Sequence, residues 1–118
     1  MKIYKTEKDY RKLYPYLPKI VQGLGDTIDD LYNKGCSSME YNAYQMCLEN
    51  ELKSLVMSGI MDSEMAYIVS RYFNLDPSAH WERIEPQHVA RRRIERGNIL
   101  KWIDSQKRNN NEKRRKKN

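Results

Sequence analysis

Apolar residues recur three and four residues apart through most of the chain, in segments separated by prolines, glycines and capping residues. This spacing is typical of amphipathic helices, and no alternating apolar-polar pattern long enough for a strand accompanies it. The clearest instance follows Ser37, where Leu48 and Leu52 mark one face of a long helix. With 118 residues, the chain has room for one modest core. We therefore predict an all-α fold, in which residues 1–108 form a single small bundle of five to six helices.

Local signals set the expected ends of these helices. Thr6 and Ser37 are suitable N-caps, and Glu40 completes a capping box with Ser37. Gly35 is a natural helix terminator, and Pro77 suits the first position of a helix. The helices are expected at residues 6–14, 18–34, 38–57, 63–73, 77–84 and 86–107, with residues 1–5 extended or frayed.

Charge is unevenly distributed along the chain. Residues 1–85 hold 10 Lys or Arg against 13 Asp or Glu, a net −3, whereas residues 86–118 hold 12 against 3, a net +9. The two parts sum to the +6 of the whole chain. Such asymmetry is typical of an acidic body with a basic arm that binds a polyanion, and nucleic acid is the commonest one in cytosol. The alternative is a solvated helix face followed by a solubilising tail.

The basic part of the chain divides into a helical cluster and a tail. The three residues Arg91-Arg92-Arg93 cannot all face away from the core, so we expect one of them to lie at its boundary. Residues 109–118 (NNNEKRRKKN) are of low complexity, and we predict that they form a disordered basic tail. Both parts are expected to contact phosphate groups. The candidate nucleic-acid-binding residues here are Arg91, Arg92, Arg93, Arg96, Lys101, Lys107, Arg108, Lys113, Arg114, Arg115, Lys116 and Lys117.

The segment Ala66–Ile84 resembles a helix-turn-helix motif. Ser70 is the small residue where two helices cross closely, Asn74 tolerates positive φ in the turn, and Leu75 fills the angle between the helices. The resemblance implies that a second helix, starting near residue 77, reads DNA with the side chains at its start. The candidate base-contacting residues are Ser78, His80 and Arg83.

Two features depart from this motif. His80 stands where the second helix should direct an aliphatic residue inward, so Trp81 or Ile84 would have to fill that space. Pro86 limits the second helix to about two turns, because the residue before a proline is disfavoured in helical geometry. A plain helical hairpin has the same spacing, and both interpretations stay open.

Four tyrosines crowd the N-terminal segment among lysines and arginines. In one interpretation they stack on single-stranded bases. In the other, which we favour, they fill a small core and keep their hydroxyl groups in water. These residues are Tyr4, Tyr10, Tyr14 and Tyr16.

Nothing in the sequence predicts catalysis, a metal site or a cofactor. His80 and His88 lie on either side of a proline break and lack a recognised ligand spacing. Cys36 has no base at motif spacing, and the pair Gly23-x-Gly25 is not part of a strand-helix phosphate loop. The two cysteines are expected to be reduced thiols of a cytoplasmic protein. No apolar run is long enough to cross a bilayer, and we expect no membrane partner.

These features together predict a small basic nucleic-acid-binding protein, with DNA favoured over RNA, of the kind that regulates a mobile element through a helix-turn-helix. The alternative is a protein-interaction module that inhibits or adapts a larger nucleic-acid-processing enzyme. In that case exposed tyrosine, tryptophan and methionine side chains would anchor the partner. The sequence leaves the oligomeric state open.

Overall fold

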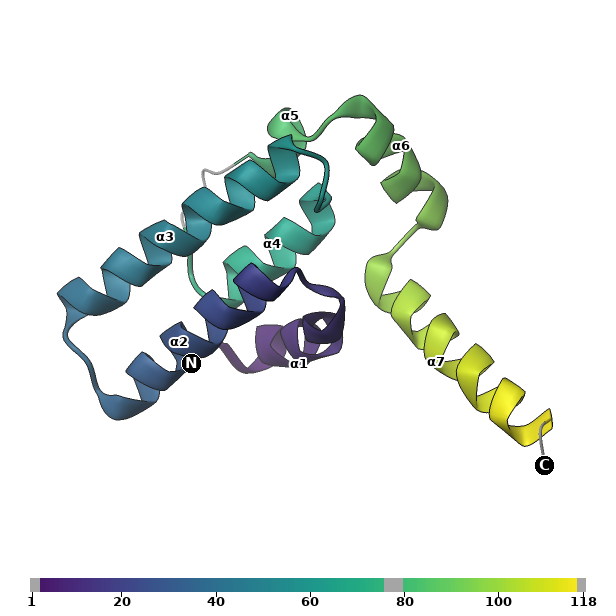
Figure 1. Ribbon diagram of the computed structural model, residues 1–118, viewed down its shortest axis with the longest axis horizontal. Coiled ribbons are helices and arrows are strands. Elements are labelled where there is room, and N and C mark those ends of the chain that lie inside the picture. The colour runs from purple at the N-terminus through teal and green to yellow at the C-terminus, as the bar shows by residue number, and fades with distance from the viewer. Residues whose placement is uncertain (1–2, 76–79, 117–118) are drawn as a thin grey trace.

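The computed structural model describes the backbone of residues 3–75 and 80–116 and the side chains of residues 7–75 and 80–108. Every regular element in these ranges is a helix, which confirms the all-α fold class (Figure 1). Seven α-helices are described, one more than the upper expectation of six. They are α1 (Ile3–Leu13), α2 (Lys19–Lys34), α3 (Ser38–Met57), α4 (Ser63–Tyr72), α5 (Trp81–Ile84), α6 (Gln87–Arg96) and α7 (Ile99–Lys116), with a 3-10 turn (Tyr14–Tyr16) between α1 and α2.

Three of the predicted helix ends are confirmed by their capping geometry. Helix α2 ends at Gly35, which adopts a left-handed conformation with φ of 73°. Helix α3 begins after Ser37, whose hydroxyl accepts a hydrogen bond from the Glu40 N–H at 3.2 Å. Helix α4 begins after Asp62, whose carboxylate accepts from the Met65 N–H at 2.9 Å. Local signals in the sequence therefore set the end of α2 and the starts of α3 and α4.

Two other boundaries differ from the prediction. Helix α1 begins at Ile3, so Thr6 lies inside the helix and the N-cap predicted there is wrong. No glycine or proline precedes Thr6, so nothing in the sequence stops the helix from extending backwards past it. The single helix expected over residues 86–107 is also wrong, because the helix is interrupted after Arg96, where α6 ends, and resumes at Ile99, where α7 begins. Gly97 has φ of 80° there, and the Asn98 side chain caps α7 by accepting from the Leu100 N–H at 2.9 Å.

Helices α1 to α4 enclose the core of the bundle. Figure 1 shows α2 running alongside α3, with α4 between them in this view, and α1 packs against α4. Tyr10 of α1 is fully buried, stacks on the ring of Tyr72 at 4.3 Å between centroids, and meets Phe73 edge-on at 5.1 Å. Tyr10 is thus a core residue as predicted, but its hydroxyl group is buried as well, so the expectation that this group stays in water is wrong for Tyr10. The Tyr4 side chain lies outside the described residues. The largest fully buried side chains are Tyr10, Phe73, Leu13, Ile28, Leu48, Leu52, Met61, Ile103, Val21, Val56 and Val69.

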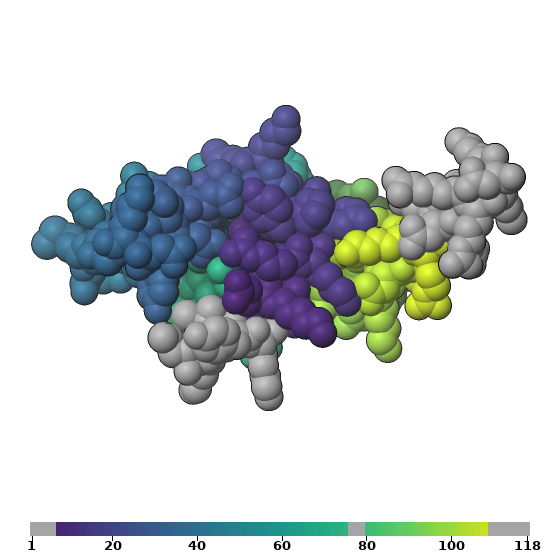
Figure 2. Space-filling model, turned by 90° about the horizontal axis from the view of Figure 1, so that it is seen from below, coloured from purple at the N-terminus to yellow at the C-terminus, as the bar shows by residue number. Residues whose placement is uncertain are grey.

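Helices α6 and α7 form an arm that leaves this bundle. Val89 of α6 and Ile99 and Ile103 of α7 are buried, and α7 passes beside α1 (Figure 2). Lys12 of α1 donates a hydrogen bond to Asp104 of α7 at 3.0 Å. The C-terminal half of α7 then runs beyond the bundle (Figure 1). The radius of gyration, 15.8 Å, accordingly exceeds the roughly 13.5 Å of a compact chain of this length.

Candidate nucleic-acid interface

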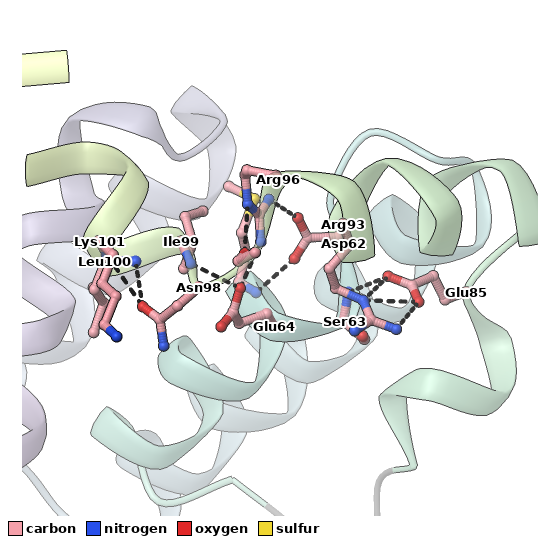
Figure 3. A network of polar contacts seen from close by, with 12 residues as sticks. Asp62, Ser63, Glu64, Glu85, Arg93, Arg96, Asn98, Ile99, Leu100 and Lys101 are labelled. Atoms are coloured by element: carbon pink, nitrogen blue, oxygen red, sulfur yellow. Dashed lines mark hydrogen bonds and ion pairs between the residues drawn. The ribbon is translucent and has the colours of Figure 1, made fainter. Parts of the chain in front are cut away.

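A buried carboxylate ties the arm to the bundle. The Glu85 side chain, which precedes α6, is only 1% exposed. It accepts a hydrogen bond from the Ser63 N–H at 2.7 Å, at the start of α4. It also pairs with the Arg93 guanidinium, whose Nε and Nη2 donate at 2.9 to 3.2 Å (Figure 3). A two-nitrogen pair of this kind is geometrically specific, so it fixes the rotation of α6 about its own axis.

The protonation of Glu85 follows from these partners. Burial alone would raise the pKa of the Glu85 carboxyl, because a charged group is disfavoured away from water. The hydrogen bonds from Arg93 and from the Ser63 N–H outweigh burial, and the pKa is lowered. The pKa of Arg93 is raised, chiefly by its hydrogen bond to Glu85. Both groups are therefore charged at neutral pH.

A second arginine joins α6 to the same end of α4. The Arg96 guanidinium donates to Asp62 and to Glu64, each at 2.5 Å (Figure 3). Glu64 also accepts from the backbone N–H of Ile99, the first residue of α7, at 3.1 Å. Carboxylates at a helix N-terminus are favoured by the helix dipole, so the positions of Asp62 and Glu64 at the start of α4 are favourable even without Arg96. The first turn of α4 is thus the anchor of the whole arm.

The remaining basic side chains of the arm that the structure describes, as far as Arg108, face water. Among the described residues, none of them has a carboxylate partner. Arg91 and Arg92 are exposed, and they lie about 160° and about 100° from Arg93 around the axis of α6. The expectation that one residue of the arginine triplet lies at the core boundary is confirmed, and that residue is Arg93. We call the exposed side chains of the arm the exposed basic set, and they are Arg91, Arg92, Lys101, Lys107 and Arg108.

The turn that follows α4 has the backbone conformation that the sequence predicted at Asn74. Asn74 has φ of 54°, and it is the one described residue other than glycine with positive φ. Leu75 and Ser70 are buried beside it. The Gln45 side chain donates to the Phe73 carbonyl at 2.7 Å and so holds the turn against α3.

The helix that follows this turn is shorter than predicted. His80 has φ of −88° and ψ of 83°, so it precedes α5 and is not part of it. Trp81 takes the inward position and is buried, while Glu85 is extended before Pro86 as the sequence predicted. Among the described residues only the single turn Trp81–Ile84 is helical between these two constraints, so a second helix that runs through His80 is wrong, while residues 77–79 of the expected helix lie outside the described residues.

The predicted base-contacting and tail residues fall in three groups. His80 and Arg83 are exposed at α5. Ser78 and Lys117 lie outside the described residues. The backbone of α7 is helical through Lys116, so it continues past the fraying expected after Lys107. No side chain beyond Arg108 is described, and the disorder predicted for residues 109–118 stays a prediction. The tail residues with a described backbone are Lys113, Arg114, Arg115 and Lys116.

Comparisons with known proteins assign no relative to this arrangement. A scan against models of protein families found no match, and searches of curated proteins and of solved structures found none either. None of the described helices is long and apolar enough to span a membrane.

Proposed function

We propose that the arm binds nucleic acid through its phosphate backbone. The supporting observation is the division of the arginines of α6 into two sets. Arg93 and Arg96 are engaged by carboxylates of the protein itself, whereas Arg91 and Arg92 are exposed without such a partner among the described residues. Cations held on an anchored helix lose little freedom when they meet phosphate, so their attraction is retained as affinity.

The proposed contacts are to phosphates, so they do not distinguish one base sequence from another. Each phosphate that a lysine or arginine neutralises releases a counterion, so affinity falls as salt rises. A helix of one turn, such as α5, presents few side chains to a major groove. Base reading by Ser78, His80 and Arg83 therefore stays a prediction, as do the preference for DNA over RNA and a role in regulating a mobile element.

The salt dependence of binding tests this proposal. Replacing Arg91 and Arg92 together with alanine should weaken binding to a DNA duplex. It should also reduce the slope of log K against log salt by about 2, since each lost phosphate contact contributes about 0.9. The measurement is fluorescence anisotropy of a labelled duplex between low and moderate salt.

A matched variant removes the same charge from the bundle. Lys8 of α1 and Lys19 of α2 are exposed, so Lys8→Ala/Lys19→Ala makes the same change of net charge outside the arm. This variant should retain the slope of the wild type. Equal losses in the two double variants would show that only net charge matters, and the assignment to the arm would then be wrong.

An acidic protein is the alternative polyanion for the exposed basic set, in keeping with an interaction module that adapts a nucleic-acid-processing enzyme. The two ligands are distinguished by competition. Excess unlabelled duplex should displace a labelled duplex from the arm, and nuclease treatment should abolish any complex formed in a cell extract. A complex that persists after nuclease treatment, with no measurable duplex binding by the pure protein, would favour the acidic protein.

A further inference from the structure

Helix α6 carries two exposed side chains that phosphate binding does not explain. Ile94 is 70% exposed, and Glu95 beside it is exposed as well. Glu85, just before α6, and Asp104 of α7 each pair with a cation of the protein. Among the acids of the arm whose side chains are described, Glu95 is thus the one without an ion-pair partner. An unpaired carboxylate beside exposed arginines repels phosphate, so it weakens a surface that contacts only the DNA backbone.

Both side chains share the exposed side of α6 with Arg91. They follow Arg91 by three and four residues, so they lie about 60° to one side of it and about 40° to the other. The buried Val89 and the two anchoring arginines, Arg93 and Arg96, lie about 140° to 160° from Arg91. The face of α6 that is turned away from the bundle therefore presents a cation, an apolar side chain and an acid side by side.

The lengths of these side chains decide what each of them reaches. Isoleucine and glutamate are short, so on a helix that lies against a duplex they contact only the surface directly beneath the helix. Arginine is long, so Arg91 and Arg92 can extend sideways to the phosphates that border a groove. Helix α6 has ten residues and is about 15 Å long, and the major groove of B-DNA, about 12 Å wide, admits a helix of this kind. In that position the short side chains face the edges of the bases.

Base edges in the major groove offer a partner for each of the two side chains. The N4 amino group of cytosine donates hydrogen bonds there, and a glutamate carboxylate accepts them. The methyl group of thymine provides an apolar contact for isoleucine. Phosphate groups have neither a donor nor an apolar surface. The arginines and the two short side chains together are therefore complementary to a DNA duplex, whereas the deep and narrow major groove of an RNA duplex excludes a helix.

We propose that α6 lies in the major groove of duplex DNA, where Glu95 selects a cytosine and Ile94 selects a thymine. This inference rests on the proposed function of the arm, because Arg91 and Arg92 hold the phosphates that position the helix. The ion pairs on the opposite side of α6 keep Glu95 and Ile94 in one orientation, as specific contacts require. A one-turn helix such as α5 offers no comparable face.

Selection of binding sites from a pool of random DNA duplexes tests this proposal. The wild type should enrich a site with one preferred cytosine and one preferred thymine. Glu95→Ala should lose the preference for the cytosine, and Ile94→Ala should lose the preference for the thymine. Both side chains are exposed and alanine is a good helix former, so circular dichroism should show an unchanged helix content.

Affinities for the selected duplex and for a scrambled duplex separate base recognition from net charge. Glu95→Ala should bind the selected duplex about tenfold more weakly, because one lost base contact has about this effect. It should bind the scrambled duplex more tightly, because a negative charge has been removed. A change of charge alone would shift both affinities in the same direction.

Glu40→Ala is the matched control outside the arm. Glu40 is exposed in the first turn of α3, and its contact with Ser37 is made by the backbone N–H, which alanine retains. This variant makes the same change of net charge as Glu95→Ala. It should retain the ratio of the two affinities that the wild type shows.

Three results would overturn the proposal. Salt-dependent binding of the wild type to every DNA duplex alike would overturn it and leave the phosphate-binding function intact. An equal loss of the affinity ratio in Glu40→Ala and Glu95→Ala would do the same. A base preference on RNA duplexes that Glu95→Ala abolishes would show that the contact is not made in the major groove of DNA. Failure of the wild type to bind any duplex at low salt would remove the proposed function as well.

Discussion

Replacing Arg93 with methionine is expected to lower the free energy of unfolding by about 3 kcal/mol. The change leaves the Glu85 carboxylate, 1% exposed, without its guanidinium partner. Removing one member of a buried pair costs about this much because the other charge is left uncompensated. Urea denaturation at neutral pH, followed by circular dichroism, measures the loss.

Two variants show whether the loss comes from the unpaired charge. Arg92→Met makes the same change one residue earlier on the exposed side of α6, and it should shift the free energy of unfolding by less than about 0.5 kcal/mol. In Glu85→Gln/Arg93→Met no charge is left unpaired, and the amide oxygen can still accept from the Ser63 N–H. This double variant should be more stable than Arg93→Met alone. If Arg93→Met is no less stable than Arg92→Met, the pair does not anchor the arm.

The same pair predicts how stability depends on pH. Because the folded-state pKa of Glu85 lies below its ordinary value of 4.5, the folded state holds this proton less tightly than the unfolded state does. The contribution of the pair is therefore complete above about pH 5, and it is lost as the pH falls through the folded-state pKa. In Arg93→Met, burial is no longer outweighed by the guanidinium, so the pKa of the Glu85 carboxyl rises and its protonation costs the folded state less. The stability that the variant loses between pH 5 and pH 3 should therefore be smaller than the loss in the wild type. Urea unfolding at pH 7, 5, 4 and 3 compares the two proteins, and identical profiles would contradict the assignment.

Replacing Gly25 with alanine is expected to destabilise the fold by about 2 kcal/mol. A Cβ at this position would lie 2.5 Å from the Tyr10 hydroxyl oxygen and 2.9 Å from Cζ of Phe73. Tyr10 and Phe73 are both fully packed, so neither ring can move without disturbing the aromatic cluster. Thermal and urea denaturation should both show the loss.

Gly23 provides the matched control, two residues earlier in the same helix. A Cβ there meets no atom within 4 Å. Gly23→Ala should therefore raise the free energy of unfolding by about 0.5 to 1 kcal/mol, because alanine is a better helix former and restricts the unfolded chain. Similar effects of the two substitutions would mean that helix propensity, and not the contact with Tyr10 and Phe73, decides the cost at Gly25.

The sequence predicted those parts of the fold that depend on local chemistry. The cap at Ser37, the terminator at Gly35 and the positive φ of Asn74 each follow from the side chain at one position. The break at Gly97 was missed, although a glycine followed by a capping asparagine is a usual signal for it. Apolar spacing alone continued through that point and indicated one helix.

The candidate site was predicted only in part, because long-range contacts decide which arginines of α6 are paired with carboxylates and which are exposed. The position of Glu85 before Pro86 predicts its extended backbone but not its pairing with Arg93 and with the start of α4. Periodicity alone does not separate the arginines. Arg93 and Arg96 follow the buried Val89 by four and seven residues and share its side of the helix, but Arg92 follows it by three and lies only about 60° away. The carboxylates that meet Arg93 and Arg96 come from distant positions that no local pattern identifies.

Neighbouring arginines of α6 have two roles, since some pair with carboxylates of the bundle and others are exposed to water. The spacing of residues along α6 is therefore as constrained as their identity. Inserting or deleting one residue between Val89 and Arg93 would rotate the rest of the helix by about 100° relative to the buried valine. The guanidinium groups that hold the arm would then turn outward, and one of their neighbours would meet Glu85 instead. Substitutions among exposed basic positions should thus be tolerated far more readily than any change of spacing within this short helix.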